Sequence, residues 1–234
     1  MGGRVCDNVA MKPAALLLDL DGTLVDSEAF HTESIVRFLA KRGLELTDSE
    51  RAFIVGHAWQ DIFAHLQVSS RLGLSLEELQ CGAIAEKPQM VEDGHSITVL
   101  PGARALVDWG AAGEIPMAIV SGSSRLEIGY ALTLLGFEEL LKFYMGAEDV
   151  RYGKPNPEGY LAAATRLRVE PPGCIVFEDS TAGIASGRAA GMFVVATRAA
   201  NLPESHAGHQ DQSQANLVVS GLDVLELEGL GRLL

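Results

Sequence analysis

Residues 14–28, AALLLDLDGTLVDSE, join a short apolar run to two carboxylates that lie one residue apart. The five apolar residues show no helical spacing, which is typical of a strand buried on both faces of a parallel sheet. Gly22 and Thr23 break the extended run, so Asp19 and Asp21 are expected to leave the sheet at its carboxyl end, where open α/β sheets hold their ligands. Because neighbouring carboxylates repel each other, the pair predicts a cation at this edge.

The composition is that of a globular protein with small ligands. The chain has 234 residues, of which 47% are hydrophobic, so it can form one sizeable domain with a smaller inserted one. Its formal charge of -13 argues against a general affinity for nucleic acid or for an anionic membrane, since both require basic surface. We therefore expect a small-molecule partner, with the chain acting as a monomer or a small homo-oligomer.

Three cysteines, Cys6, Cys81 and Cys174, are widely spaced and odd in number. This pattern predicts neither a disulfide framework nor a zinc site, and we expect all three to be reduced and structural. The first twelve residues lack the apolar core of a signal peptide, and no later stretch reaches the roughly 18 apolar residues that span a bilayer. A cytoplasmic location is expected, with Met11 an alternative start after a loose tail.

The pattern of apolar residues divides the chain into three parts. Between residues 29 and 92, apolar side chains recur at helical spacing, as at Ile35, Phe38 and Leu39. From Leu100 onward, strand and helix signals alternate, which predicts repeated β-α units and a parallel sheet. We therefore expect a tail of residues 1–13, a Rossmann-like α/β core formed by 14–26 and 97–234, and a small helical domain over 27–96. Core strands are predicted at 116–120, 142–145, 174–177 and 193–196, an edge strand at 217–219, helices at 124–136, at 157–167 and ending near 191, and a surface loop at 201–214.

Polar residues follow the predicted strand that ends at Val120. Ser121, Gly122 and Ser123 offer hydroxyl groups and accessible backbone N–H groups just before a helix, an arrangement that suits a phosphate. A Ser-rich helix cap is the structural alternative. The other strand-end motifs favour the phosphate interpretation, because they are expected at the same edge of the sheet.

A second acidic pair, Glu178 and Asp179, follows the strand that ends at Phe177. Such a pair is often solvated surface, but here Asp179 can complete a hard-oxygen site with Asp19 and the Asp21 carbonyl. Mg²⁺ suits such a site, because it binds through one or two carboxylates together with a substrate phosphate oxygen and waters. Lys154, which lies between turn-forming residues in GKPNP, is predicted to be the counter-ion of these acids rather than a solvated surface charge.

Four stretches, DLDGTLVDSE, IVSGSS, GKPNPEGY and VFEDSTAGIASGRAAGM, resemble the four signature motifs of the haloacid dehalogenase (HAD) superfamily in order and spacing. The resemblance covers the core from about residue 14 to 197. The helical segment after the first motif is similar to the cap of the subgroup that contains β-phosphoglucomutase, sugar phosphatases and glycerol-3-phosphatases. The fold implied is a Rossmann-like HAD core with a parallel sheet and an α-helical cap domain inserted after the first strand.

The resemblance implies a phosphoryl-transfer mechanism. Asp19 would attack phosphorus to form an aspartyl-phosphate, and Asp21 would act as general acid and then general base. Ser121, Gly122, Ser123 and Lys154 would bind the phosphoryl group. The family's magnesium would be bound by Asp19, Asp179 and the Asp21 carbonyl, with Glu178 a direct ligand in some relatives. Dehalogenases of this superfamily lack the second aspartate, so the presence of Asp21 argues against dehalogenation.

The cap decides what accepts the phosphoryl group, and three functions stay open. They are a Mg²⁺-dependent phosphatase of small sugar or polyol phosphates, a phosphosugar mutase, and a non-catalytic binding protein that keeps the fold. Trp59 stands where the mutase resemblance leads us to expect an arginine, which weakens the mutase hypothesis. Trp59 can stack on a sugar or pack in the cap, and His31 and His57 are either substrate contacts or incidental histidines. Lys87 is either a second cap cation or an exposed lysine.

Overall fold

The computed structural model describes residues 12–57, 59–206 and 208–234. Its centre is a six-stranded parallel sheet in the order β5-β4-β1-β6-β7-β8, so the α/β class with a parallel sheet is confirmed. The first strand lies inside the sheet, between β4 and β6, and the strand at 217–219 lies at one edge as predicted. The strands are β1 (Ala15–Leu18), β4 (Met117–Val120), β5 (Phe143–Met145), β6 (Cys174–Glu178), β7 (Phe193–Thr197) and β8 (Leu217–Val219).

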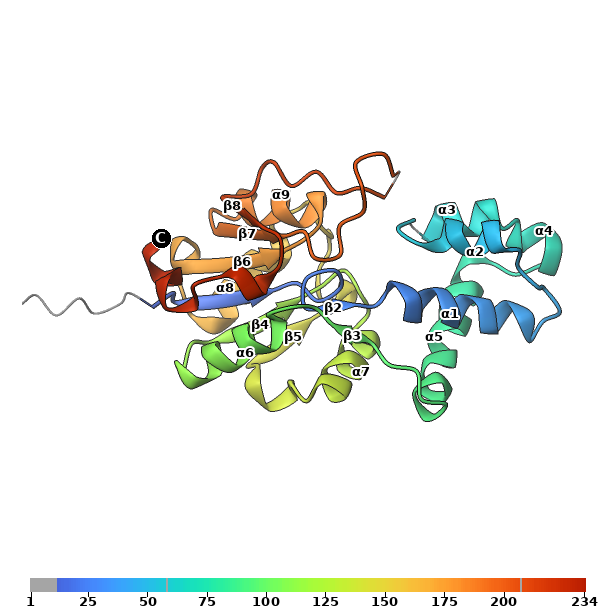
Figure 1. The fold of residues 1–234 in the computed structure, drawn as a ribbon, viewed down its shortest axis with the longest axis horizontal. Helices are drawn as coiled ribbons and strands as arrows, with labels where there is room; N and C mark the ends of the chain where they lie inside the picture. Colours follow the sequence, from blue (N-terminus) through green and yellow to red (C-terminus); the bar gives the residue numbers. More distant parts are fainter. Residues whose placement is uncertain (1–11, 58, 207) are drawn as a thin grey trace, which may run out of the picture.

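Helices cover both faces of this sheet (Figure 1), as expected for a parallel sheet whose central strands are buried on two sides. Leu16 and Leu18 of β1 pack in one cluster with residues of α6 (Ala103–Ala112) and α7 (Arg125–Leu135). Ala15 and Leu17 pack on the opposite face with α8 (Glu158–Leu167) and α9 (Thr181–Ala189). Because successive side chains of a strand alternate between faces, one apolar run supplies both clusters. Because both faces of the strand are apolar and covered by helices, its polar neighbours lie beyond its end.

A second, helical body lies beside the carboxyl edge of the sheet (Figure 1). It has an apolar cluster of its own, to which Ile35, Phe38, Leu39, Ile54, Ile62 and Leu66 contribute, as their helical spacing predicts. We call this body the cap. Its helices are α1 (Glu28–Ala40), α2 (Asp48–Ile54), α3 (Trp59–His65), α4 (Val68–Leu72) and α5 (Leu76–Glu92).

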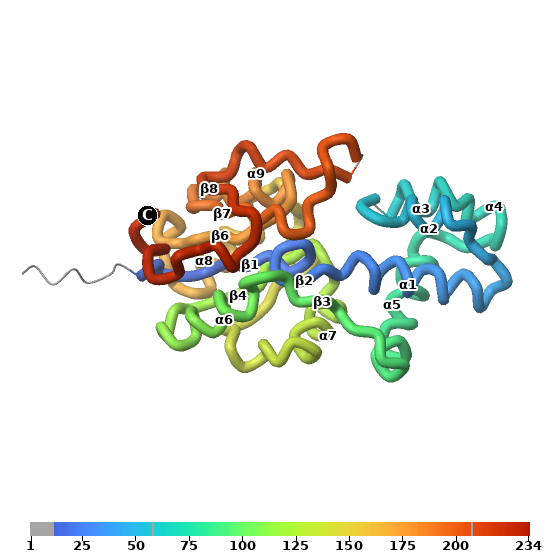
Figure 2. Tube along the Cα trace, in the orientation of Figure 1, coloured from blue at the N-terminus to red at the C-terminus, as the bar shows by residue number. Residues whose placement is uncertain are grey.

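Two adjacent chain segments connect the cap to the sheet domain (Figure 2). The outgoing segment contains β2 (Val25–Asp26) and the returning one contains β3 (Thr98–Val99). They pair antiparallel, with Val25 opposite Val99 and Asp26 opposite Thr98. Since β2 begins four residues after Asp21, any movement at this two-stranded link acts close to the acidic pair.

The Ser-rich turn after β4 does cap a helix, although through its last residue. Ser124 is the N-cap of α7 and its hydroxyl accepts from the backbone N–H of Glu127, while Gly136 ends the helix in the left-handed conformation. The helix-cap interpretation thus applies to Ser124, while Ser121, Gly122 and Ser123 precede the cap and keep the phosphate interpretation as a prediction. The predicted ends of α7 agree with the structure to within one residue.

Outside the sheet edge, two smaller expectations can be compared with the structure. Cys81 and Cys174 are unpaired, as expected, with Cys81 exposed and Cys174 buried; Cys6 lies outside the described residues, as does Met11. Among the described residues, no helix combines the length and the apolar character that a membrane crossing requires.

Candidate active site

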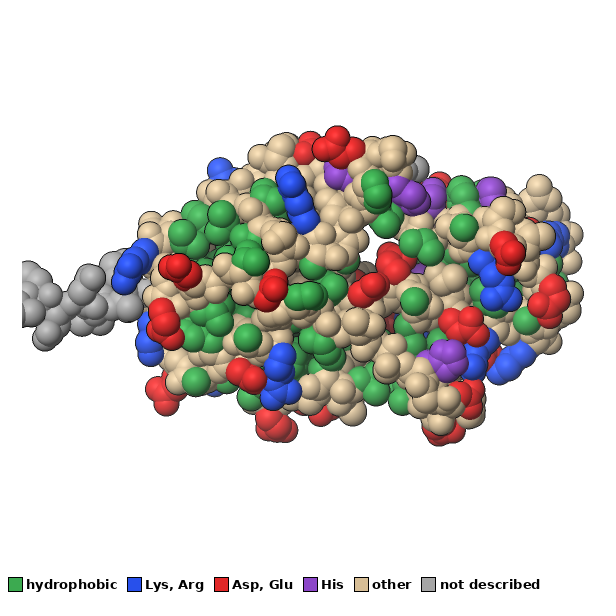
Figure 3. Space-filling view, in the orientation of Figure 1, with side chains coloured by type: hydrophobic (Ala, Val, Ile, Leu, Met, Phe, Trp, Pro, Cys, Tyr) green, Lys and Arg blue, Asp and Glu red, His purple; other side chains and the backbone are tan. Residues whose placement is uncertain are grey.

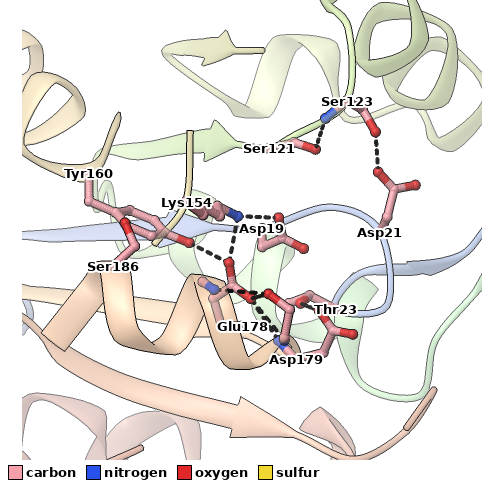
Figure 4. Close-up of polar contacts among 12 residues, drawn as sticks. Asp19, Asp21, Thr23, Ser121, Ser123, Lys154, Tyr160, Glu178, Asp179 and Ser186 are labelled. Atoms are coloured by element: carbon pink, nitrogen blue, oxygen red, sulfur yellow. Dashed lines mark hydrogen bonds and ion pairs between the residues drawn. The ribbon is translucent and has the colours of Figure 1, made fainter. Parts of the chain in front are cut away.

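The charged centre of the site is an ion pair shared by three strand-end or turn residues. The Lys154 ammonium donates to Asp19 Oδ1 at 2.6 Å and to Glu178 Oε1 at 2.5 Å (Figure 4). Asp19 and Glu178 are buried and the Lys154 side chain is 15% exposed, although Asp19 and Glu178 are 159 residues apart in the sequence. The ends of β1 and β6 are neighbours in the sheet, which brings Asp19 and Glu178 close together. Lys154 pairs with both of them, as the counter-ion that the sequence predicted.

Glu178 has its hydrogen-bonding capacity filled by the protein itself. Its Oε1 accepts from Lys154 and from the Tyr160 hydroxyl, the latter at 2.9 Å. Its Oε2 accepts from the backbone N–H groups of Asp179 and Ser180 and from the Ser180 hydroxyl. A carboxylate held by five donors is fixed in place. It organises the turn after β6, and the sequence did not single out Tyr160 for this contact.

Asp179 lies against the turn that follows Asp21. The Thr23 hydroxyl donates to Asp179 Oδ1 at 3.5 Å, and Gln212 donates to the Asp179 carbonyl at 2.7 Å. Gly22 has a φ of +79°, and a Cβ at that position would lie 2.2 Å from Asp179 Oδ2. Glycine is therefore required here by both the backbone conformation and the close approach of the acid.

One oxygen from each of Asp19, Glu178 and Asp179 lies within 4.8 Å of the others. Burial raises the pKa of Asp19 to about 7 against the opposing effect of Lys154, and burial raises the pKa of Asp179 well above its usual range. Burial alone would lower the pKa of Lys154, but its pairing with Asp19 and Glu178 holds it well above the usual value. The cluster thus holds three carboxylates, of which only Asp19 and Glu178 pair with Lys154, and a divalent cation with oxygen ligands fits the charge and chemistry of this donor set.

Asp21 belongs to a separate hydrogen-bond network on the cap side. The Ser27 hydroxyl donates to Asp21 Oδ1 at 2.5 Å, and the Ser123 hydroxyl donates to Oδ2 at 2.6 Å. The two neighbouring aspartates therefore differ, since Asp19 faces the lysine and Asp21 faces two hydroxyl groups. Ser27 was not predicted as a site residue, although it lies within the quoted motif.

In the turn that was predicted to bind phosphate, Ser121–Ser123, both serine hydroxyl groups already have partners within the protein. Ser121 is buried and its hydroxyl accepts from the Ser123 backbone N–H at 3.0 Å. The Ser123 hydroxyl is already bound to Asp21, so Ser123 contacts the acid rather than standing free. A side chain at Gly122 would meet open space, which leaves the backbone of this turn accessible from the cleft.

A cavity of about 280 Å³ opens between the cap and the sheet domain, next to Asp21, Gly122 and Ser123. The four predicted cap residues all line it: His31, His57, Trp59 and Lys87. His31 and Trp59 contact each other edge to face, with ring centroids 4.6 Å apart. Burial lowers the pKa of His31 to about 4, with Lys87 adding to the effect. A hollow between the two bodies, edged by acidic side chains, is visible in Figure 3.

Lys87 is not an exposed lysine, because it forms an ion pair across the cavity. Its Nζ lies 2.5 Å from Glu127 Oε1, and the two side chains are 13% and 19% exposed. Lys87 belongs to α5 of the cap, and Glu127 belongs to the first turn of α7 in the sheet domain. Glu127 was not singled out from the sequence, because its partner Lys87 is 40 residues away and belongs to another element.

Removal of the Lys154 charge is expected to destabilise the fold. In Lys154→Met, two buried carboxylates lose their shared cation, and we expect the free energy of unfolding to fall by about 3–5 kcal/mol. Urea denaturation with a chelator present measures this change.

Arg104→Met is the control, since Arg104 pairs with Asp108 and the two side chains are 56% and 50% exposed. An exposed pair contributes little, so we expect the control to lose less than about 1 kcal/mol. Equal losses in the two variants would contradict the structural role given to Lys154.

The fold and site define a class of protein, namely an α/β core with a parallel sheet, an acidic cluster at the carboxyl edge of the sheet and a helical cap beside that edge. The family model for haloacid dehalogenase-like hydrolases matches residues 16–197. The chain therefore belongs to this family, as its motifs predicted.

Similar proteins of known activity are phosphatases. The chain is 37% identical over 179 residues to the validoxylamine A 7'-phosphate phosphatase of Streptomyces hygroscopicus subsp. limoneus, covering 76% of this chain and 83% of that protein. It is 31% identical over 189 residues to the fructose-1-phosphate phosphatase of Escherichia coli, covering 79% and 96%. These relationships place the chain among the phosphoric monoester hydrolases.

A solved structure with a similar fold is a HAD family hydrolase from Deinococcus radiodurans with bound phosphate and sodium. Its TM-score is 0.67 at 27% identity, and the match covers 96% of this chain and 98% of that one. The similarity therefore includes both the sheet domain and the cap.

Proposed function

We propose that this enzyme is a Mg²⁺-dependent phosphatase that hydrolyses a small sugar phosphate or polyol phosphate through an aspartyl-phosphate intermediate. The observation that carries the proposal is that Asp19 and Asp21, one residue apart, have different hydrogen-bond partners. Asp19 is buried against Lys154, while Asp21 is held by the hydroxyl groups of Ser27 and Ser123. A nucleophile and a proton donor require such different surroundings.

In the first step, a carboxylate oxygen of Asp19 attacks phosphorus and the bond from phosphorus to the ester oxygen breaks. Asp21 gives its proton to that oxygen, so the sugar or polyol leaves as a neutral alcohol. In the second step, Asp21 takes a proton from water as the water oxygen attacks phosphorus. The bond between Asp19 and phosphorus then breaks, which releases inorganic phosphate and restores both side chains.

Asp19, Asp179 and the Asp21 carbonyl are proposed to hold the magnesium ion. Bound there, the ion would supply positive charge that offsets repulsion between the carboxylates and the phosphoryl oxygens. Glu178 already accepts five hydrogen bonds from the protein, which supports an indirect role for it. It would fix Lys154 and the backbone of Asp179, while Lys154 balances charge on the transferring group.

The substrate class follows from the cap cavity and from the named relatives. A cavity of about 280 Å³ suits a small metabolite, and it is next to the turn at Ser121–Ser123 that is proposed to bind the phosphoryl group. The cap, proposed to comprise residues 27–96, supplies His31, His57 and Trp59 as polyol contacts. Related proteins include phosphatases named for validoxylamine A 7'-phosphate, fructose 1-phosphate and hexitol phosphates.

The mutase alternative is not favoured. A mutase has to return the phosphoryl group to a second hydroxyl of the sugar, and the mutase resemblance leads us to expect a cap arginine near position 59. This chain has Trp59 there, in edge-to-face contact with His31. The named relatives reported above are phosphatases.

A panel of sugar and polyol monophosphates tests the proposal directly. We expect stoichiometric release of inorganic phosphate with Mg²⁺ present, and loss of turnover when a chelator removes the metal. Readdition of Mg²⁺ should restore the rate, because the acidic cluster is buried within an otherwise intact fold. Absence of phosphate release across the panel, or formation of an isomeric sugar phosphate instead, would contradict the assignment.

A further inference from the structure

An ion pair between Lys87 of the cap and Glu127 of the sheet domain lines the cavity between the two bodies. Both residues line the same cavity as Asp21 and Ser123. Their atoms are 2.5 Å apart, and neither side chain is more than one-fifth exposed. Because this pair is shielded from water, its charges are felt within the cavity more strongly than surface charges would be.

Glu127 is held in place by more than the lysine. Its Oε2 accepts from both the backbone N–H and the hydroxyl of Ser124, at 3.1 and 2.8 Å. Burial tends to raise the pKa of Glu127, but Lys87 and Ser124 outweigh it and lower that pKa, so the group stays anionic at neutral pH. The carboxylate is thus a fixed negative charge on a rigid helix end rather than a mobile surface group.

The charges of the cavity are unfavourable for a second anion on the substrate. The described residues that line it include three acids, Asp21, Glu28 and Glu127, and one lysine, Lys87, which is already paired. His31 adds no positive charge near neutral pH, since its pKa is lowered to about 4 mainly by burial. A neutral polyhydroxyl group can use these oxygens as hydrogen-bond acceptors, whereas a second phosphate or carboxylate would meet repulsion.

We propose that Glu127 is a specificity-determining residue, which cancels the charge of Lys87 across the cleft and thereby selects monophosphates whose leaving group carries no second anion. The inference rests on the proposed phosphatase function and narrows its substrate class. Without Glu127, the cap lysine would be available to an anionic group at the far end of the substrate. Specificity then depends on a repulsive element as well as on attractive contacts.

The test compares three matched pairs of substrates in the full-length enzyme with Mg²⁺. The pairs are glycerol 3-phosphate with 3-phosphoglycerate, fructose 1-phosphate with fructose 1,6-bisphosphate, and glucose 6-phosphate with 6-phosphogluconate. In each pair the second member adds one anionic group. The measured quantity is the ratio of kcat/KM within a pair, from which any loss of folded enzyme cancels.

In Glu127→Gln, the glutamine amide can still cap α7 but the negative charge is gone. We expect the preference for the neutral member to fall by about tenfold, mainly through a lower KM for the anionic member, as one charge is exchanged in a shielded cleft. Adding Lys87→Met in the same enzyme should return the ratio toward the wild-type value. Glu139→Gln removes an exposed acid that follows the C-terminal end of α7 in the sequence, and it should leave the ratio unchanged.

The outcomes separate the two proposals. A ratio that does not change in Glu127→Gln, or that stays changed in the double variant, would overturn the role of Glu127 while leaving the phosphatase assignment intact. Wild-type enzyme that prefers the anionic members would also overturn it. Inactivity of the wild-type enzyme on all six compounds would overturn the phosphatase assignment, and the inference with it.

Discussion

Asp19→Asn is expected to lower kcat by about 10⁴-fold or more, whichever sugar or polyol phosphate is used. The amide keeps the size of the side chain but cannot attack phosphorus, and it also removes one of the proposed metal ligands. The buried site loses a carboxylate whose pKa is already raised to about 7, so the fold should not suffer. Steady-state phosphate release measures the loss, and thermal unfolding checks that the variant is folded.

Two further observations would support this interpretation of Asp19→Asn. Because the variant keeps Ser121, Gly122 and Lys154, we expect it still to bind substrate, with a dissociation constant within about tenfold of the wild-type KM. Isothermal titration with a substrate from the panel measures that affinity. Residual turnover above about 1% of wild type, in enzyme shown to be free of deamidated asparagine, would contradict a nucleophilic role.

Asp21→Asn is expected to lower kcat by about 10²–10⁴-fold for substrates with a poor leaving group such as an alkoxide. The hydroxyl groups of Ser27 and Ser123 hold this side chain at both oxygens, so an amide should occupy the same position without exchanging a proton. The comparison of an alkyl phosphate with p-nitrophenyl phosphate measures the effect. The nitrophenolate leaves without a proton, so its first step should be much less affected.

Asp61→Asn serves as the matched control for Asp21→Asn. Asp61 is an exposed acid of the cap helix α3, and the same substitution there should change kcat by less than about twofold. If Asp21→Asn slowed formation of the intermediate equally for both leaving groups, Asp21 would be a structural or metal-organising residue rather than the proton donor.

Local sequence was sufficient to locate the sheet edge. Asp19, Ser121 and Glu178 each follow an apolar run, and parallel strands bring their carboxyl ends together, so the cluster needed only the order of strands. The glycine at position 22 and the lysine at 154 could be interpreted from the same motifs. Each of these features is encoded within its own short motif, which is why the sequence predicts it.

Contacts between residues that are far apart in the chain could not be predicted from the sequence. Lys87 and Glu127 are 40 residues apart and lie on different domains, so no periodicity or motif pairs them. Ser123 was expected to contact phosphate, but whether its hydroxyl also reaches Asp21 depends on how two loops pack. Glu178 was predicted as a possible metal ligand, but the five protein donors around its carboxylate could not be foreseen from the motif. These details depend on tertiary packing, which a linear pattern does not specify.

The stereochemical course at phosphorus tests the central claim most directly. A phosphoryl group that passes through Asp19 undergoes two in-line displacements, each of which inverts the configuration. Hydrolysis of an isotopically chiral thiophosphate monoester in isotope-labelled water is therefore predicted to give inorganic thiophosphate with net retention. Net inversion would show a single displacement by water, and would contradict the aspartyl-phosphate mechanism.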